Sequence, residues 1–362
     1  MPVRDLIIVG AGPSGLSAAI AAKQHGLDYQ VIEQGVLVNS IYHFPPQMVF
    51  FTTPELLEIG GLPFVSPYEK PTRAEALRYY RKVVDAFDLQ ISFEEQVLSV
   101  KRESDIEADG PVFAVETRST RGVRRVRHGR NVALAIGYYD HPVMLGIPGE
   151  DLPHVHHYYG EPHPYYRQRV VIVGGGNSAA ESALELHRAG AHVTLVHRWP
   201  ELKSTIKYWV KPDIENRIKE GSVAARFNTC VAEIRPTSVI VTPTAFTRGR
   251  ESTLEAEGRE SSVTDERGWD PASVEKEEIA ADAVFLLTGY HPDYALLTSA
   301  GVTLDDRGVP SHDSETFETN VPGLFVAGGT IAGKDTAPIF IENGRFHGER
   351  IVDAIVRRAG AT

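Results

Sequence analysis

The sequence predicts an α/β fold made of two similar parallel-sheet units. Short apolar runs alternate with amphipathic stretches along the 362 residues, which is the pattern of repeated βα units. A strand, a glycine-rich turn and a helix occur near the N-terminus and again after residue 169. A segment rich in Pro, Gly and His, 138–167, separates the two occurrences. The length also favours more than one domain.

The expected elements of the first unit are strands 6–9, 29–33, 112–117 and 131–136 and helices 15–25 and 73–88. A charged stretch, 121–130, is expected to be the solvated tip of a hairpin. The second unit is expected to contain strand 170–173, helix 177–189 and strand 193–196. Residues 247–278 show no periodicity, so we expect a long loop or a hairpin insertion there. Strands 283–288 and 324–327 and a helix from about Ala337 close the chain.

Composition excludes several classes of protein. The 37 basic and 48 acidic residues give a formal charge of −11, so we expect neither a nucleic-acid partner nor an anionic membrane surface. No apolar run approaches the roughly 20 residues that span a bilayer, and the N-terminal residues do not resemble a signal peptide. Cys230 is the single cysteine, which excludes intrachain disulfides and CxxC pairs. We therefore expect a cytoplasmic protein without a bound metal.

The first glycine turn has the features of a dinucleotide-binding loop. Gly10, Gly12 and Gly15 form GxGxxG between a strand and a helix, with Pro13 and Ser14 inside the turn. The first glycine permits the tight turn, the second lets a pyrophosphate approach the backbone, and the third lets the helix pack on the strand. Glu33 ends the next strand, about 20 residues later, where a carboxylate accepts hydrogen bonds from ribose hydroxyls.

The second glycine turn has the same form but a different ending. Gly174, Gly176 and Ala179 form GxGxxA, and the following strand ends in His197 and Arg198 with no acidic residue. A carboxylate would repel a ribose 2′-phosphate, whereas a guanidinium binds one through charge-assisted hydrogen bonds. The sequence therefore favours NADPH over NADH.

Two nucleotide-binding units in one chain indicate a relay in which a nicotinamide gives a hydride to a flavin. A chain of this kind is expected to return to the first unit near its C-terminus. The turn at Gly289 and the apolar strand that ends before Gly328 fit this expectation. Pro338 suits the first turn of a helix that would face the flavin pyrimidine ring.

Several longer motifs resemble the bacillithiol disulfide reductase family of thioredoxin-reductase-like flavoproteins. They lie at residues 39–42, 57–61, 163–166, 204–207 and 289–294, and above all at 341–348, which read IENGRFHG. The resemblance implies a Rossmann-like, three-layer ββα FAD domain, residues 1–138 and 287–362, split by an inserted NADPH domain, residues 139–286. It also implies a homodimer or homotetramer and hinges near Gly137 and Gly289. The implied reaction is NADPH-dependent reduction of bacillithiol disulfide to bacillithiol, and the expected partner is a small-molecule disulfide or a small redox protein.

Together the motifs and the resemblance give the expected cofactor contacts. Those to FAD are Gly10, Gly12, Pro13, Ser14, Gly15, Glu33, Gln34, Tyr42, Val97, Gly137, Gly328 and Ala337. Those to NADPH are Gly174, Gly176, Asn177, Ser178, Ala179, His197, Arg198, Lys203 and Lys207.

Three departures from the resembled families bear on the chemistry. The loop that would carry the CxxC of a thioredoxin reductase holds Asn177 and Ser178 instead. Ser14 stands where the bacillithiol reductases usually carry a cysteine, and a hydroxyl cannot form a mixed disulfide. Ser14 is nevertheless the candidate catalytic residue by position. Gly329 replaces an aspartate that holds the flavin ribityl chain in thioredoxin reductases.

Other functions remain open at this point. A ferredoxin- or flavodoxin-NADP reductase shares the expected architecture and needs no cysteine. A flavin monooxygenase also pairs FAD with NADPH, and a nucleotide-sensing flavoprotein would bind both cofactors without turnover. Four histidines between the two units, at positions 154, 156, 157 and 163, could supply protons to a leaving thiolate, but surface or linker roles are favoured.

Overall fold

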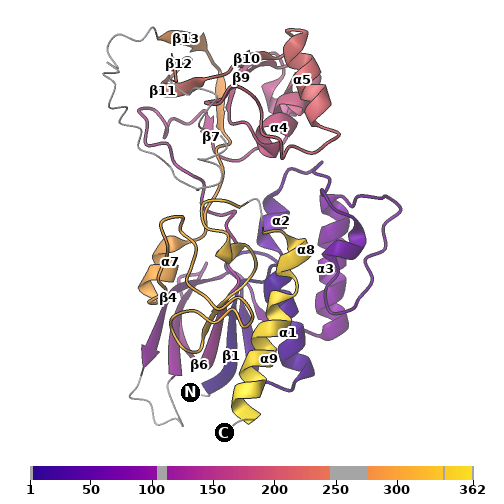
Figure 1. Ribbon diagram of the computed structural model, residues 1–362, viewed down its shortest axis with the longest axis vertical. Coiled ribbons are helices and arrows are strands. Elements are labelled where there is room, and N and C mark those ends of the chain that lie inside the picture. Colours follow the sequence, from indigo (N-terminus) through magenta and orange to yellow (C-terminus); the bar gives the residue numbers. More distant parts are fainter. Residues whose placement is uncertain (1–2, 104–111, 245–275, 337–338, 361–362) are drawn as a thin grey trace. The chain divides into compact units, whose positions relative to one another are not determined.

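The computed structural model describes residues 3–103, 112–244, 276–336 and 339–360. The chain forms two compact units (Figure 1). The first comprises Met1–His141 and Tyr290–Thr362, and the second comprises Pro142–Gly289. The sequence placed these divisions three residues earlier, at 138/139 and 286/287.

The first unit is built around a seven-stranded sheet of order β3-β2-β1-β6-β5-β4, with β15 also paired to β6. The parallel part consists of β1 (Val3–Val9), β2 (Tyr29–Ile32), β3 (Ile91–Ser92), the C-terminal half of β6 (Arg124–Leu134) and β15 (Leu324–Val326). The N-terminal half of β6 pairs antiparallel with β5 (Val112–Ser119), which pairs with β4 (Glu95–Glu103).

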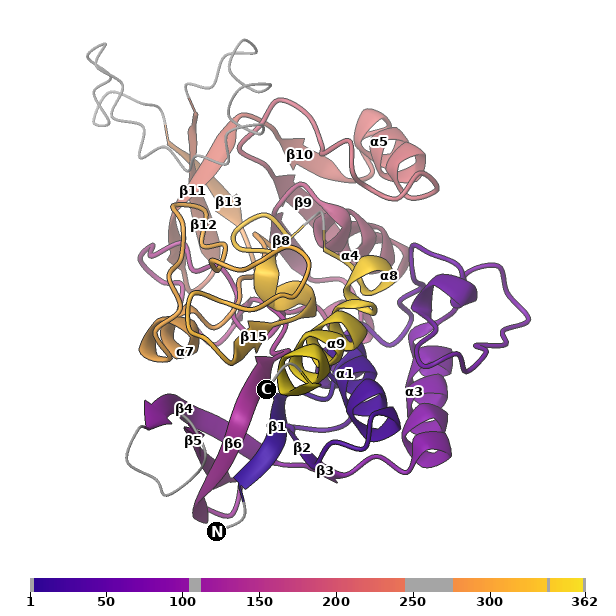
Figure 2. The same ribbon diagram turned by 60° about the horizontal axis from the view of Figure 1, so that its bottom comes forward.

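Helices cover one face of this parallel sheet, and the antiparallel strands β4 and β5 lie toward the other face (Figure 2). On one face pack α1 (Pro13–Gln24), α3 (Arg73–Phe87) and α9 (His347–Gly360), around Leu6, Ile8 and other buried side chains. On the other face Ile7 and Val9 pack with residues of β4, β5 and α7 (Tyr294–Ser299). The alternation of apolar side chains along β1 thus fills two cores, which gives the three layers.

The second unit repeats this architecture. Its parallel sheet has the order β10-β9-β8-β14-β7. The strands are β7 (Val155–His156), β8 (Arg169–Val173), β9 (His192–Val196), β10 (Ala224–Arg226) and β14 (Ala283–Leu286). Helices α4 (Asn177–Arg188) and α5 (Lys211–Lys219) share a core with one face. A separate antiparallel sheet packs on the other face and consists of β11 (Thr229–Arg235), β12 (Ser238–Pro243) and β13 (Glu277–Ala280). The predicted α/β class with two three-layer units is confirmed.

Local differences from the expected elements have physical reasons. Most of the charged stretch 121–130 is strand, because β6 begins at Arg124 and only residues 120–123 turn. Strand 131–136 is therefore the end of a longer strand. The expected C-terminal helix is broken into α8 (Ile341–Gly344) and α9, which begins at His347. Ala337 and Pro338 lie outside the described residues, as does most of 247–278.

The first unit also contains the short helices α2 (Asn39–His43), η1 (Pro54–Leu57) and η4 (Gly328–Ile331). The second unit contains η2 (His163–Tyr165). Among the described helices, none combines the length and apolar character needed to cross a membrane.

Candidate functional site

The first glycine loop is shaped by close backbone approaches. Gly10 has φ +105°, and a Cβ there would lie 2.4 Å from the Ala135 carbonyl oxygen. A Cβ on Gly15 would lie 2.0 Å from the Gly10 carbonyl oxygen. A Cβ on Gly12 would meet no atom within 4 Å, so packing does not require glycine at this position. The bare Gly12 backbone leaves open space beside the start of α1, where N–H groups without a side-chain cap can bind phosphate.

Glu33 lies directly after β2, and its side chain bonds to the backbone of this loop. Its buried carboxylate accepts hydrogen bonds from the backbone N–H groups of Ala11 and Gly35, both at 2.8 Å. Burial raises the pKa of Glu33 above its usual value, although these two hydrogen bonds oppose the shift. A carboxylate has about four acceptor positions, so two remain for ribose hydroxyls. The adjacent Gln34 side chain instead donates to Asp140, at 2.7 Å.

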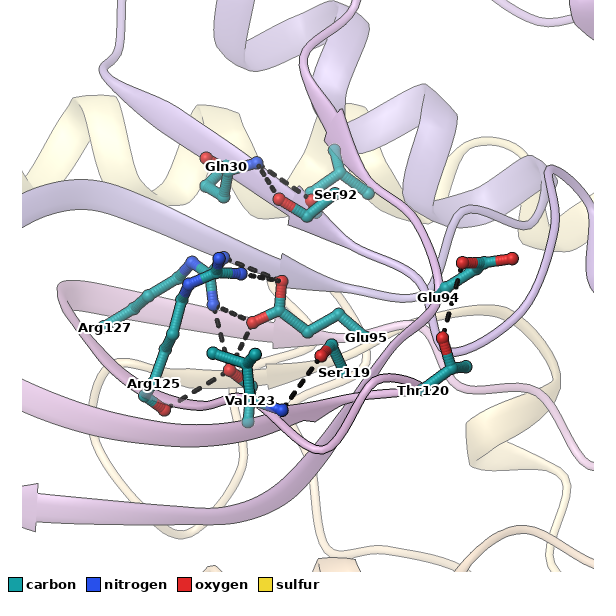
Figure 3. Close-up of polar contacts among 11 residues, drawn as sticks. Gln30, Ser92, Glu94, Glu95, Ser119, Thr120, Val123, Arg125 and Arg127 are labelled. Carbon is teal, nitrogen blue, oxygen red and sulfur yellow. Dashed lines mark hydrogen bonds and ion pairs between the residues drawn. The ribbon is translucent and has the colours of Figure 1, made fainter.

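A buried ion pair supports the segment next to Glu33 (Figure 3). The Glu95 backbone N–H donates to the Glu33 carbonyl oxygen at 2.9 Å. The Glu95 carboxylate is 3% exposed and accepts hydrogen bonds from both terminal nitrogens of Arg127 and from the Thr117 hydroxyl. Burial alone would raise the pKa of Glu95, but the hydrogen bonds and the arginine charges outweigh burial and lower it. No motif in the sequence indicates this network.

Ser14 lies in the first turn of α1 and faces two glycines. A Cβ on Gly328 would lie 2.3 Å from the Ser14 Oγ, and a Cβ on Gly344 would lie 3.1 Å from it. A Cβ at Gly328 would thus require the Ser14 hydroxyl to move, whereas at Gly344 the approach is only tight. Gly328 has φ +60° and is expected to contact FAD, so the structure brings two of the expected residues together.

Tyr138 lies close by, four residues after the end of β6. A Cβ on Gly329 would lie 2.7 Å from the Tyr138 ring, so the ring rests on this bare backbone. Gly137 has φ +65°, and its N–H donates to the Thr330 hydroxyl at 3.2 Å. The Tyr138 ring that covers position 329 thus explains the glycine there, and no sequence motif indicates this contact.

His347, the first residue of α9, holds the Gly328 turn. Its Nδ1 accepts a hydrogen bond from the Gly328 N–H at 3.0 Å, and its ring stacks on Phe317 with centroids 4.0 Å apart. Burial, with the nearby charge of Arg350, lowers the pKa of His347 to about 4. The imidazole is therefore neutral at physiological pH and able to accept this bond.

Two other expected FAD contacts are peripheral to this group. Tyr42, on α2, is 48% exposed, and the Arg73 guanidinium carbon lies 5.6 Å from its ring centroid. Val97, in β4, is half-buried two residues after Glu95. Ala337 falls outside the described residues.

The second glycine loop repeats the features of the first. Gly174 has φ +152°, and a Cβ there would lie 2.5 Å from the Leu287 carbonyl oxygen and 3.1 Å from the Ala179 Cβ. A Cβ on Gly176 would meet only the Lys203 side chain, at 4.0 Å. The start of α4 again has no side-chain cap, so its N–H groups are available to a phosphate. Ser178 is exposed in this first turn.

His197 and Arg198 lie at the end of β9, beside this loop. The His197 ring lies on Gly175, where a Cβ would come within 2.1 Å of it, and its buried Nε2 has no partner among the described residues. Burial, with the charges of Arg198 and Lys203, lowers the pKa of His197 to about 4. Arg198 and Lys203 are both exposed, which leaves two cations able to meet an anionic ligand.

Lys207 is placed differently from these cations. It is buried, and its ammonium donates to the Glu181 carboxylate at 2.8 Å. Its backbone N–H donates to the Asn177 side-chain oxygen, also at 2.8 Å. Asn177 thus ties the start of α4 to the 203–207 loop, while the charge of Lys207 is already neutralised.

Cys230 and two of the histidines between the units, His154 and His156, have structural surroundings. Cys230 lies in β11 without a disulfide partner, and burial raises the pKa of its thiol. His154 Nε2 lies 3.2 Å from the Arg235 carbonyl oxygen, and the His156 ring packs on Phe285. Within the described residues, no group of three or more His, Cys, Asp or Glu side chains is arranged to hold a metal ion.

Comparisons with known proteins give the family. The family model of the pyridine nucleotide-disulphide oxidoreductases matches residues 7–258 and 254–328. Bacilliredoxin reductase Bdr of Bacillus subtilis is 40% identical over 353 residues, 97% of each chain. A ferredoxin-NADP reductase of Ignicoccus hospitalis is 27% identical over 331 residues, 90% of each chain.

Solved structures agree with this result. Bacillithiol disulfide reductase Bdr from Bacillus cereus has a TM-score of 0.86 and 36% identity, covering 99% of this chain and 100% of its own. The enzyme from Staphylococcus aureus has a TM-score of 0.84 and 36% identity, with 99% of each chain covered. A thioredoxin reductase from T. acidophilum, at 21% identity and a TM-score of 0.70, shares the fold. The chain therefore belongs to the pyridine nucleotide-disulphide oxidoreductases and, within them, to the Bdr family of bacillithiol disulfide reductases.

Proposed function

We propose that this enzyme binds FAD in the unit Met1–His141 with Tyr290–Thr362 and NADPH in the unit Pro142–Gly289, and that it reduces a bacillithiol-type low-molecular-weight disulfide. The observation that carries the proposal is that both glycine loops lead into helices without a side-chain cap, while different residues follow the next strand in each unit. The Glu33 carboxylate lies beside the first loop, and His197 and Arg198 follow the strand beside the second. The Bdr relatives, whose names specify bacillithiol disulfide, support the choice of substrate.

The first loop fits FAD on structural grounds. Gly12 provides open backbone beside the α1 N-terminus, and Glu33 retains acceptor positions for a ribose. His347 fixes the Gly328 turn at the edge of the same sheet. Bound FAD supplies a ring that takes up a hydride and passes on two electrons.

The second loop fits a nucleotide with a 2′-phosphate. Arg198 and Lys203 are exposed cations near an uncapped helix N-terminus, and the buried His197 Nε2 has no partner among the described residues. The two residues directly after β9 are His197 and Arg198, so no carboxylate stands at the position that Glu33 has after β2. We assign 2′-phosphate binding to Arg198 and Lys203, and to Lys207 the structural pairing with Glu181.

The chain's own residues bind and orient in this scheme. The first turns of α1 and α4 bind pyrophosphates, Glu33 orients a ribose, and Arg198 selects the phosphorylated nucleotide. We propose that the Ser14 hydroxyl donates a hydrogen bond in the site and forms no bond to sulfur, because an oxygen cannot form a mixed disulfide.

The test is a single set of assays on purified protein. The absorbance spectrum shows whether flavin is bound. Oxidation rates are then compared between NADPH and NADH. The acceptors are bacillithiol disulfide, a bacilliredoxin mixed disulfide, ferredoxin and oxygen. We expect NADPH oxidation that depends on bacillithiol disulfide, and a homodimer or homotetramer by light scattering. Protein that lacks flavin and cannot be reconstituted with it would refute the proposal.

Ferredoxin- or flavodoxin-NADP reductase is the second candidate. The single cysteine, together with similarity to a ferredoxin-NADP reductase over 90% of the chain, favours it over the remaining alternatives. Faster reoxidation by ferredoxin than by any disulfide would decide for it.

A further inference from the structure

Three loops follow neighbouring strands at the carboxyl edge of the second parallel sheet. The glycine loop follows β8, His197 and Arg198 follow β9, and residues 227–228 follow β10. The sheet order β10-β9-β8 makes these strands neighbours (Figure 2). A dinucleotide with its pyrophosphate at the glycine loop and its 2′-phosphate at Arg198 has its ribose at the end of β9, and the base attached to that ribose extends toward β10. The loop after β10 is therefore the part of this edge that faces the adenine base.

Asn228, two residues after the end of β10, is held firmly in this loop. Its backbone N–H donates to the Trp199 carbonyl oxygen at 3.1 Å, and its carbonyl oxygen accepts from the Thr244 N–H at 2.6 Å. The Thr229 N–H donates to the His197 carbonyl oxygen at 3.1 Å. Asn228 has φ +51°, a left-handed conformation that asparagine adopts more readily than most residues. The residue is thus fixed beside the segment that follows β9.

The side chain of Asn228 is not satisfied within the described chain. Its Oδ1 is buried and accepts no hydrogen bond from any residue that the structure describes, although the residue as a whole is half-buried. A second buried atom without such a partner, His197 Nε2, belongs to the end of the neighbouring strand. A buried acceptor without a donor is costly, and most are paired with protein, water or a ligand. The Asn228 oxygen therefore indicates a missing donor.

The adenine base carries a donor of the required kind. Its 6-amino group is the group through which asparagine side chains recognise adenine in protein–DNA complexes. The phosphates of the nucleotide carry negative charge and offer acceptors, so they do not satisfy a carbonyl oxygen. The amino group is also the donor that lies beyond the ribose, on the side of β10. Position and chemistry thus agree.

We propose that Asn228 Oδ1 accepts a hydrogen bond from the adenine 6-amino group and makes the NADPH site selective for an adenine nucleotide. This inference rests on the proposed function and concerns the base, whereas Arg198 concerns the 2′-phosphate. Because Oδ1 is closed to water in this structure, the base reaches it by displacing surface side chains that cover it. The backbone hydrogen bonds of Asn228 hold the amide in place, so little further ordering of this residue accompanies binding.

The experiment measures binding rather than turnover. Isothermal titration calorimetry of the full chain gives the dissociation constants of 2′,5′-ADP and of its purine analogue, in which hydrogen replaces the 6-amino group. We expect wild type to bind 2′,5′-ADP roughly 10-fold more tightly than the analogue, the effect of one hydrogen bond to a buried acceptor. Asn228→Gly should abolish this preference, because it removes the side chain while glycine adopts φ +51° without strain.

Two further variants separate base recognition from other effects. Asn228→Asp keeps an acceptor, so it should keep the preference for adenine, although its charge weakens binding of both nucleotides. Arg198→Ala should weaken binding of both nucleotides to the same extent and leave the preference unchanged. Thermal unfolding followed by circular dichroism checks that each variant is folded.

The outcomes distinguish the inference from the proposed function. Equal dissociation constants for the two nucleotides in wild type would overturn the role of Asn228, and this comparison needs no variant. An unchanged preference in Asn228→Gly would overturn it as well. Wild type that binds neither nucleotide would instead overturn the assignment of NADPH to the second unit, and the inference with it.

Discussion

Arg127→Met should destabilise the first unit markedly. Glu95 is 3% exposed and the Arg127 side chain 18% exposed, with one terminal nitrogen 2.8 Å from Oε2 and the other bonded to Oε1. Loss of one partner from a buried ion pair costs about 3–5 kcal/mol, because the other charge stays buried without compensation. Arg125, 3.7 Å from the carboxylate, and Thr117 remain, so we expect about 3 kcal/mol.

Thermal unfolding followed by circular dichroism measures this effect. About 3 kcal/mol corresponds to a fall in Tm of roughly 6–12 °C for a domain of this size class. Arg124→Met is the matched control, because it breaks an exposed pair with Glu116 on the same strand, and it should change stability by less than about 1 kcal/mol. The double variant Glu95→Gln with Arg127→Met should regain part of the loss. A fall in Tm no larger than that of Arg124→Met would refute the account.

The pH dependence has a definite sign. The folded-state pKa of Glu95 is lowered, so its contribution is present above the unfolded value and is lost as pH falls through the folded value. Wild type and Arg127→Met should therefore differ most at neutral pH and converge in acid. Because the Glu95 N–H donates to the Glu33 carbonyl oxygen, Arg127→Met should also release FAD more readily.

Three further predictions concern the cofactor loops and the thiol. Arg198→Ala should raise the KM for NADPH by about 10- to 100-fold and leave that for NADH nearly unchanged, since a charged hydrogen bond contributes about 1.5–3 kcal/mol; equal effects on both would contradict the assignment. Gly328→Ala, at φ +60° and with a Cβ 2.3 Å from the Ser14 Oγ, should cost at least about 1–2 kcal/mol of folding free energy and lower the FAD content of purified protein. Cys230→Ser should keep full disulfide reductase activity, and anaerobic titration should end at one NADPH per flavin; uptake of a second equivalent would reveal a thiol carrier.

The sequence was sufficient to predict the parts of the fold that depend on local patterns. The strand, glycine loop and helix at residues 3–24 and again at 169–188 follow from apolar periodicity and from positions where a Cβ collides with a neighbouring carbonyl. The assignment of each loop to one cofactor remains a prediction.

Features that depend on contacts distant in sequence could not be predicted. Glu95 and Arg127 are 32 residues apart on strands that are not adjacent, and either one alone resembles a solvated charge. Lys207 pairs with Glu181, 26 residues away, although its position after Arg198 suggested phosphate binding. The break between α8 and α9 places His347 against Gly328. The apolar periodicity of this segment predicts one continuous helix and not this contact.

A thiol at position 14 could take part in both electron transfer and proton transfer, whereas the Ser14 hydroxyl cannot carry electrons. A redox cysteine both carries electrons and exchanges a proton with the departing sulfur, so one residue suffices. Ser14 is held between Gly328 and Gly344 at the same place, but its oxygen can only donate or accept a hydrogen bond. Under the proposed function, the electrons pass to the acceptor without a protein sulfur at this position.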